Sequence, residues 1–122
     1  MKGMSLAVLM IGTLGCDQDR ASDVCATVAA AGLAVNLTNA ATAQPVCDAS
    51  VTAVDGGYSE RLTPTSCTYV GAFERPGTYV VRVEGVGFVP KEVGPVQVVM
   101  GSGRCPHVQE VRLTVPLTPQ DE

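Results

Sequence analysis

His107 and Glu110 stand three positions apart, and their side chains are the most obvious candidates for chemistry in this sequence. A His-x-x-Glu spacing occurs in catalytic zinc sites, where an imidazole and a carboxylate bind one metal ion. The surrounding residues have the pattern of a strand, however, and positions three apart on a strand face opposite sides of a sheet. His107 is also the single histidine of the chain, so no second imidazole is available. We therefore expect no metal site, no catalytic residues and no cofactor, and we expect that the protein is not an enzyme.

Length and composition indicate one small β-rich domain. The 122 residues are 46% apolar, 4% aromatic and 16% charged, which argues against a disordered chain and against a multidomain enzyme. With 13 Gly and 8 Pro, and with many Val and Thr, the chain favours strands and turns over helices. The net charge of -4 offers no basic surface that could neutralise phosphates, so we expect no binding to nucleic acid.

The first fifteen residues have the pattern of an export signal. Lys2 supplies a positive start, and residues 4–14 form an apolar run. This run is too short to cross a bilayer as a helix, which needs roughly 20 residues. We expect residues 1–15 to be a signal peptide that is removed from the mature protein.

The end of this segment, Thr13-Leu14-Gly15-Cys16, places a small residue directly before a cysteine. It resembles the lipobox of bacterial lipoproteins. The resemblance implies that Cys16 is diacylated and becomes the mature N-terminus. Several acyl chains would hold the protein stably, because each buried CH₂ contributes about 0.8 kcal/mol. The resemblance thus implies an exported, membrane-anchored lipoprotein, in the periplasm or on the outer cell surface, and leaves the leaflet open.

The four cysteines that remain after Cys16 predict two disulfides, because an even number in a small exported domain is typical of a disulfide framework. No two of them have the C-x-x-C spacing of a zinc ribbon or a thioredoxin-type site. They are Cys25, Cys47, Cys67 and Cys105.

A predicted hairpin selects among the possible pairings. Residues 55–57, Asp-Gly-Gly, are a tight-turn signal between strand-like runs at 51–54 and 58–62. Cys47 and Cys67 lie at almost the same distance on either side of this turn. We therefore predict that Cys47 pairs with Cys67. This leaves Cys25 and Cys105 to join the first segment of the domain to its last.

Hydrophobic alternation after residue 33 predicts about seven strands. In the clearest strand, residues 78–84, Tyr79, Val81 and Val83 recur at every second position and are expected to be buried. Leu37 and Val51 are expected in the same core. Short strands between turn signals at intervals of about 8 to 12 residues predict a single antiparallel β-sandwich. The other expected strands are residues 33–38, 51–54, 58–62, 67–73, 96–100 and 108–117.

Several segments between residues 33 and 98 share a more specific pattern. They are Val35-x-Leu37-x-Asn39, Pro45-Val46, Ala49-x-Val51-x-Ala53, Asp55-Gly56-Gly57-Tyr58, Arg75-Pro76-Gly77-Thr78-Tyr79-x-Val81-x-Val83 and Gly87-Phe88. Together they resemble the carboxypeptidase regulatory-like domain, a transthyretin-like (prealbumin-like) β-sandwich of about seven strands. The Pro-Gly-x-Tyr element is the most specific part, and Ala43 stands where the first turn of that family commonly carries Gly. The resemblance implies an accessory role, because catalysis in that family belongs to a separate peptidase domain.

The expected organisation is a signal peptide at residues 1–15, a lipidated N-terminus and tether at 16–24, the sandwich at 25–118 and a tail at 119–122. We expect a non-enzymatic cell-envelope lipoprotein that acts as a binding or structural accessory module. Its expected partners are the membrane, through the lipid anchor, and an envelope or surface protein. The alternative is a small-ligand or metal carrier that uses the end of the sandwich near His107.

Overall fold

The computed structural model describes residues 28–120. Residues 29–102 and 106–120 belong to one compact unit, and the description below refers to it; Val28 and residues 103–105 do not belong to that unit. Within the described range, no helix is long and apolar enough to cross a membrane. The predicted signal peptide, Cys16 with its tether, and Cys25 lie outside the described residues.

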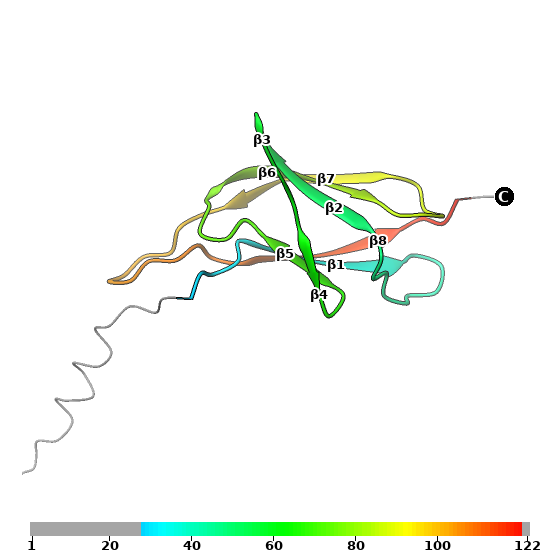
Figure 1. Ribbon diagram of the computed structural model, residues 1–122, viewed down its shortest axis with the longest axis horizontal. Coiled ribbons are helices and arrows are strands. Elements are labelled where there is room, and N and C mark those ends of the chain that lie inside the picture. Colours follow the sequence, from blue (N-terminus) through cyan, green and yellow to red (C-terminus); the bar gives the residue numbers. More distant parts are fainter. Residues whose placement is uncertain (1–27, 121–122) are drawn as a thin grey trace, which may run out of the picture. The chain divides into compact units, whose positions relative to one another are not determined.

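The described chain is built from β-strands that form two four-stranded sheets, with strand orders β4-β5-β1-β8 and β3-β2-β6-β7 (Figure 1). The predicted all-β class is confirmed. The strands are β1 (Leu33–Asn39), β2 (Ser50–Asp55), β3 (Tyr58–Arg61), β4 (Thr63–Thr65), β5 (Thr68–Gly71), β6 (Gly77–Glu84), β7 (Lys91–Val98) and β8 (Val111–Leu117).

The core lies between the inner faces of the two sheets, and β6 shows how the sequence forms it. Tyr79, Val81 and Val83 are at most 1% exposed, whereas Arg82 and Glu84 face solvent. Each buried aliphatic or aromatic side chain contributes about 1.5 to 3 kcal/mol through removal of apolar surface from water. The period of two in the sequence therefore fixes which face of β6 is buried. The predicted core positions Leu37 and Val51 belong to the same cluster.

One strand pairing differs from the predicted antiparallel sandwich. β1 and β8 run parallel, with Leu33 opposite Val111 and Leu37 opposite Val115, while the other five pairings are antiparallel. The expectation of a purely antiparallel sheet is thus wrong at this pair. Hydrophobic alternation determines which side chains are buried, but a side-chain pattern does not specify the direction of a strand relative to a distant partner.

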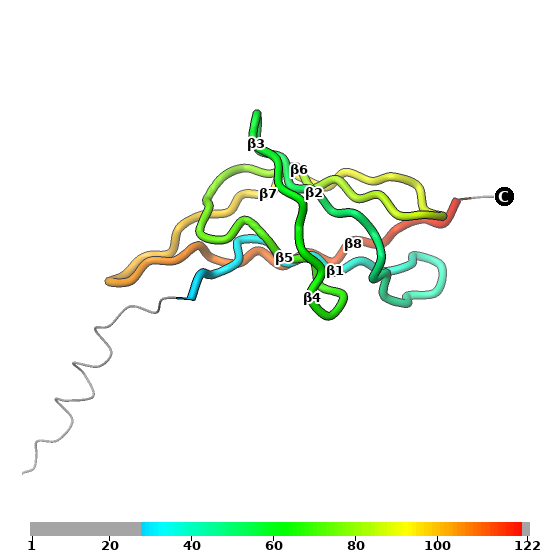
Figure 2. Tube along the Cα trace, in the orientation of Figure 1, coloured from blue at the N-terminus to red at the C-terminus, as the bar shows by residue number. Residues whose placement is uncertain are grey.

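The chain changes sheets at Leu62. β3 ends at Arg61 in one sheet and β4 begins at Thr63 in the other, as the tube in Figure 2 shows. Leu62 is buried between them, and its N–H donates to the Val51 carbonyl at 2.8 Å. The sequence predicted a loop here, because Pro64 interrupts the strand pattern. The strand predicted at residues 96–100 in fact begins earlier in the chain, since β7 starts at Lys91. Gly94 and Pro95 interrupt the hydrophobic alternation there, so the sequence pattern did not show the first half of the strand.

Three of the four edge strands carry a proline, namely Pro64 in β4, Pro95 in β7 and Pro116 in β8. In β8 the Val111 N–H donates to the Gly32 carbonyl. The backbone N–H groups of alternate residues in a strand point to opposite edges. Because the Val111 N–H points to the side of β1, the ring nitrogen of Pro116 lies on the free edge of β8, where another residue would present a donor. These prolines remove donors that another strand would need for pairing. Strand addition is therefore disfavoured at these three edges, whereas the fourth edge strand, β3, has no proline.

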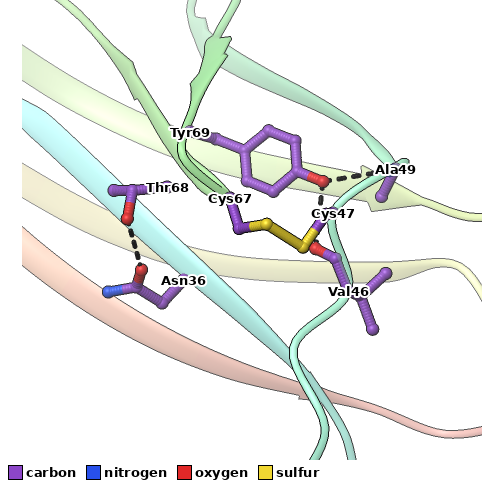
Figure 3. The surroundings of a disulfide bond; sticks show 7 residues. All are labelled: Asn36, Val46, Cys47, Ala49, Cys67, Thr68 and Tyr69. Atoms are coloured by element: carbon purple, nitrogen blue, oxygen red, sulfur yellow. Dashed lines mark hydrogen bonds between the residues drawn. A yellow bond between two sulfur atoms is a disulfide. The ribbon is translucent and has the colours of Figure 1, made fainter.

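The Cys47–Cys67 disulfide is present, as predicted (Figure 3). Its origin differs from the hairpin argument, because the β2–β3 ladder ends where Thr52 faces Arg61. Cys67 instead lies in the turn between β4 and β5, where Ser66 and Cys67 have φ of 49° and 67°. The bond therefore joins the segment before β2 to a hairpin of the other sheet. The other predicted pair, Cys25 with Cys105, includes a residue outside the described range and stays a prediction.

Tyr69 fastens the same segment next to the disulfide. Its hydroxyl accepts a hydrogen bond from the Ala49 N–H and donates one to the Val46 carbonyl, each at 3.0 Å (Figure 3). The ring is 1% exposed, so the hydroxyl satisfies backbone groups that would otherwise be buried without partners. The covalent bond and the buried tyrosine together fix residues 46–49, which belong to the segment that leads from β1 in one sheet to β2 in the other.

Candidate functional site

His107 is held by Glu74. Its Nδ1 hydrogen-bonds Glu74 Oε2, and the same carboxylate accepts the N–H groups of Ala30 at 2.8 Å and Val108 at 3.2 Å. Three chain segments meet at this carboxylate, which are the stretch before β1, the turn between β5 and β6, and the stretch before β8. We call these four residues the Glu74 junction.

The backbone of Glu74 takes part in the same junction. Its N–H donates to the Ala30 carbonyl at 3.0 Å, and its φ is 51°. A left-handed conformation is unusual for a non-glycine residue and persists where the surroundings enforce it. Hydrogen bonds from His107 and from the Ala30 N–H hold the pKa of Glu74 below its ordinary value. The carboxylate is thus kept in the charged form that its partners require.

The structure separates His107 from Glu110. Glu110 lies on the exposed surface, where its carboxylate pairs with Arg112 at 3.2 Å, while the imidazole of His107 faces Glu74. The His-x-x-Glu spacing therefore does not bring the two side chains to one ion. In the part of the chain that the structure describes, no three His, Cys, Asp or Glu side chains are grouped so that they could hold a metal.

A second polar cluster surrounds Arg75. Its guanidinium lies 3.6 Å from the centre of the Tyr58 ring, and Nη1 donates to Asp55 Oδ2 at 3.1 Å and to the Tyr79 hydroxyl at 3.0 Å. The Tyr79 hydroxyl in turn donates to the Arg75 carbonyl at 2.7 Å. We call these four residues the Arg75 cluster. It ties the β2–β3 hairpin to the turn before β6.

The sequence predicted Tyr79 in the core and Asp55 in a turn, but it predicted no contact among Asp55, Tyr58, Arg75 and Tyr79. The available signal was the pair of motifs Asp-Gly-Gly-Tyr and Arg-Pro-Gly-x-Tyr, which contribute all four residues of the Arg75 cluster. Their contact was hidden because the motifs are far apart in sequence. The contact also explains why the second motif has glycine at position 77. A Cβ on Gly77 would lie 2.4 Å from Asp55 Oδ2.

Glu60 extends the polar network beside the Arg75 cluster. Its Oε1 accepts the Tyr58 hydroxyl at 2.7 Å, and its carboxylate also accepts the Ala72 N–H. The hydrogen bond that Tyr58 donates to this carboxylate raises the pKa of the phenol, because ionisation would break it. Glu60 and Tyr58 thus act together to hold the backbone at Ala72.

Two surface hollows lie away from the Glu74 junction. One, of about 430 Å³, runs between β7 and β8 beside Val93, Leu113 and Val115, and it is bridged by a hydrogen bond from Lys91 Nζ to the Pro116 carbonyl. The other, of about 330 Å³, is lined by residues that include Asp48, Arg61, Glu84 and Val86. Neither is lined by His107.

No family model matches this sequence, and no curated protein is similar enough to count as a match. The resemblance to the carboxypeptidase regulatory-like domain therefore rests on the motifs alone.

Replacing Gly77 with Ala tests the Arg75 cluster. The new methyl group would lie 2.4 Å from Asp55 Oδ2 and 3.2 Å from Arg75 Nη1, so this ion pair must separate. We expect Gly77→Ala to lower the free energy of unfolding by about 1 to 3 kcal/mol, as overpacking usually does. Urea denaturation measures the change.

Gly57→Ala is the matched control, because a Cβ there would meet nothing within 4 Å. We expect that variant to stay within about 0.5 kcal/mol of the original protein. Equal stability of both variants would show that the close approach at Gly77 is unimportant.

Glu74→Gln tests the charge at the Glu74 junction. The folded state lowers the pKa of Glu74, so its contribution to stability is present above the ordinary value of 4.5 and is lost as pH falls through the lower folded value. We expect the variant to be less stable at neutral pH and to lose less stability on acidification. Thermal melts between about pH 7 and pH 3 measure both effects.

Glu84→Gln serves as the control, because Glu84 is an exposed glutamate of β6. If Glu74→Gln and Glu84→Gln have the same pH profile, the Glu74 carboxylate is not the group responsible.

Proposed function

We propose that the protein is an exported lipoprotein whose β-sandwich is a non-enzymatic accessory module of the carboxypeptidase regulatory-like, transthyretin-like kind. The observation that carries this proposal is the use made of the polar side chains. Glu74, His107, Asp55 and Arg75 are the groups with the most distinctive contacts, and each of them fastens one chain segment to another. Their geometry supports a rigid scaffold.

The disulfide supports export. Cys47 is exposed, and bonds of this kind persist in oxidising compartments such as the periplasm or the cell surface. This compartment agrees with the apolar N-terminal run and with the lipobox-like residues that end at Cys16. The proposal therefore joins two independent features of the chain, one at its start and one in its folded part.

The edge strands influence how such a module would bind a partner. Prolines on β4, β7 and β8 disfavour strand addition, so the loops at the two ends of the sandwich are the better contact surfaces. The proposed partner is an envelope or surface protein that meets these loops. Cross-linking in intact cells, followed by mass spectrometry, would identify it.

Intact mass of the protein extracted from membranes tests the anchor. We expect cleavage before Cys16, an added mass that corresponds to the acyl chains, and no free thiol among the other four cysteines. A Cys16→Ser variant should lack the lipid mass and leave the membrane fraction. An unmodified Cys16 in the original protein would contradict the lipoprotein proposal.

One observation favours the alternative function of a metal carrier. Histidines that bind metals commonly donate their other ring N–H to a carboxylate, which fixes the tautomer. Glu74 holds His107 Nδ1 in this way, and the side chain is 33% exposed. The arrangement would leave Nε2 as the ring nitrogen available to a metal.

His107→Ala separates the two functions. A carrier that uses this imidazole should lose its Zn²⁺ binding in a calorimetric titration of His107→Ala, because the variant removes the proposed ligand, while Gln109→Ala should bind as the original protein does. The accessory function instead predicts no Zn²⁺ binding that depends on His107 and only a modest loss of stability. Binding that is equal in all three proteins would contradict the carrier.

A further inference from the structure

Three large apolar side chains remain exposed around the Glu74 junction. Phe73, Val99 and Met100 are 48%, 42% and 43% exposed. Phe73 directly precedes Glu74, Met100 pairs with Val108 of the junction, and the Val99 carbonyl accepts the Gln109 N–H at 2.8 Å. We call Phe73, Val99 and Met100 the apolar end.

The apolar end lies where the chain enters the sandwich. Ala30 is bound to Glu74 through both its N–H and its carbonyl. In Figure 2 the start of β1, in cyan, and the turn between β5 and β6, in green, lie at the same end. The chain before the sandwich therefore arrives next to Phe73.

The charges differ between the two ends of the sandwich. Near the apolar end, the carboxylates of Asp55 and Glu110 pair with Arg75 and Arg112, and Glu74 is hydrogen-bonded to His107. At the other end of β6, Asp48, Glu84 and Arg61 border one surface hollow, and the two carboxylates form no ion pair within the described part of the chain. An anionic lipid surface would thus meet paired Asp55 and Glu110 at the apolar end, and two unpaired carboxylates beside one arginine at the other end.

We infer that the apolar end rests against the surface of the membrane that anchors the protein. The inference depends on the proposed acylation of Cys16. Twelve residues separate Cys16 from Ala29, and a chain of that length reaches at most about 45 Å. The anchor therefore allows the apolar end to reach the lipid, where exposed aromatic and aliphatic side chains enter the boundary between headgroups and acyl chains.

This orientation leaves Val86 and the hollow next to it directed away from the membrane. Val86 is 99% exposed and follows the end of β6 that is remote from Gly77 (Figure 1). The apolar end then acts as a second membrane contact beside the acyl chains. The loops near Val86 stay accessible to a partner protein.

The absence of Trp from the sequence allows a direct test. Phe73→Trp places the sole indole at the apolar end, Met100→Trp is an independent second reporter, and Val86→Trp is the matched control. Each full-length variant is purified from membranes, its acylation is checked by intact mass, and it is placed in vesicles of phosphatidylethanolamine and phosphatidylglycerol. Brominated lipids then quench any indole that lies within the outer part of the bilayer.

We expect Phe73→Trp and Met100→Trp to emit at shorter wavelength in vesicles and to be quenched at least about twofold more than Val86→Trp, given an insertion depth of about 5 to 10 Å. Equal quenching of all three in acylated protein overturns the inference and leaves the anchor intact. A shorter emission wavelength that depends on protein concentration without lipid also overturns it, because a second copy would then cover the apolar end. A missing acyl mass instead refutes the proposed anchor.

Discussion

The burial of two facing apolar surfaces is the constraint on which the rest of this structure depends. Tyr79, Val81 and Val83 of β6 face Leu37 and other side chains of the opposite sheet, and none of them is exposed by more than 1%. Such a core forms only if both sheets are held in contact where strands cross or end. Two segments that pass from one sheet to the other provide this hold. Leu62 is buried where β3 leads into β4. The Tyr69 hydroxyl and the Cys47–Cys67 bond fasten the segment before β2.

The polar clusters hold the strand ends together and give their backbone groups hydrogen-bond partners. Backbone groups that leave a ladder need partners, and their burial without partners is costly. Glu74 satisfies the N–H groups of Ala30 and Val108, and Glu60 satisfies that of Ala72. The Arg75 cluster similarly closes the hairpin onto the start of β6. These contacts explain why the most distinctive polar residues of the chain serve the scaffold.

This use of polar residues connects the structure to the proposed function. A module with prolines on three of its four edge strands presents its loops, and an anchor at one end would determine which loops face a partner. The exposed apolar side chains near Phe73 fit a lipid surface.

Two short sequence motifs supply the residues of the Arg75 cluster. Asp55 and Tyr58 come from one motif, and Arg75 and Tyr79 come from another. Local patterns marked these residues, but the cation over the Tyr58 ring required the fold. His107 shows the same limit, because its partner Glu74 stands 33 positions away and no spacing rule connects them.

The sequence by itself determined the all-β class, the buried positions of β6 and the hairpin about Asp55. These features follow from a period of two and from turn residues, both of which act over short stretches. Only the tertiary structure decided the parallel pairing of β1 with β8, the change of sheet at Leu62 and the partners of Glu74. Those features depend on contacts between residues far apart in the chain, and such contacts are selected by packing the whole core at once.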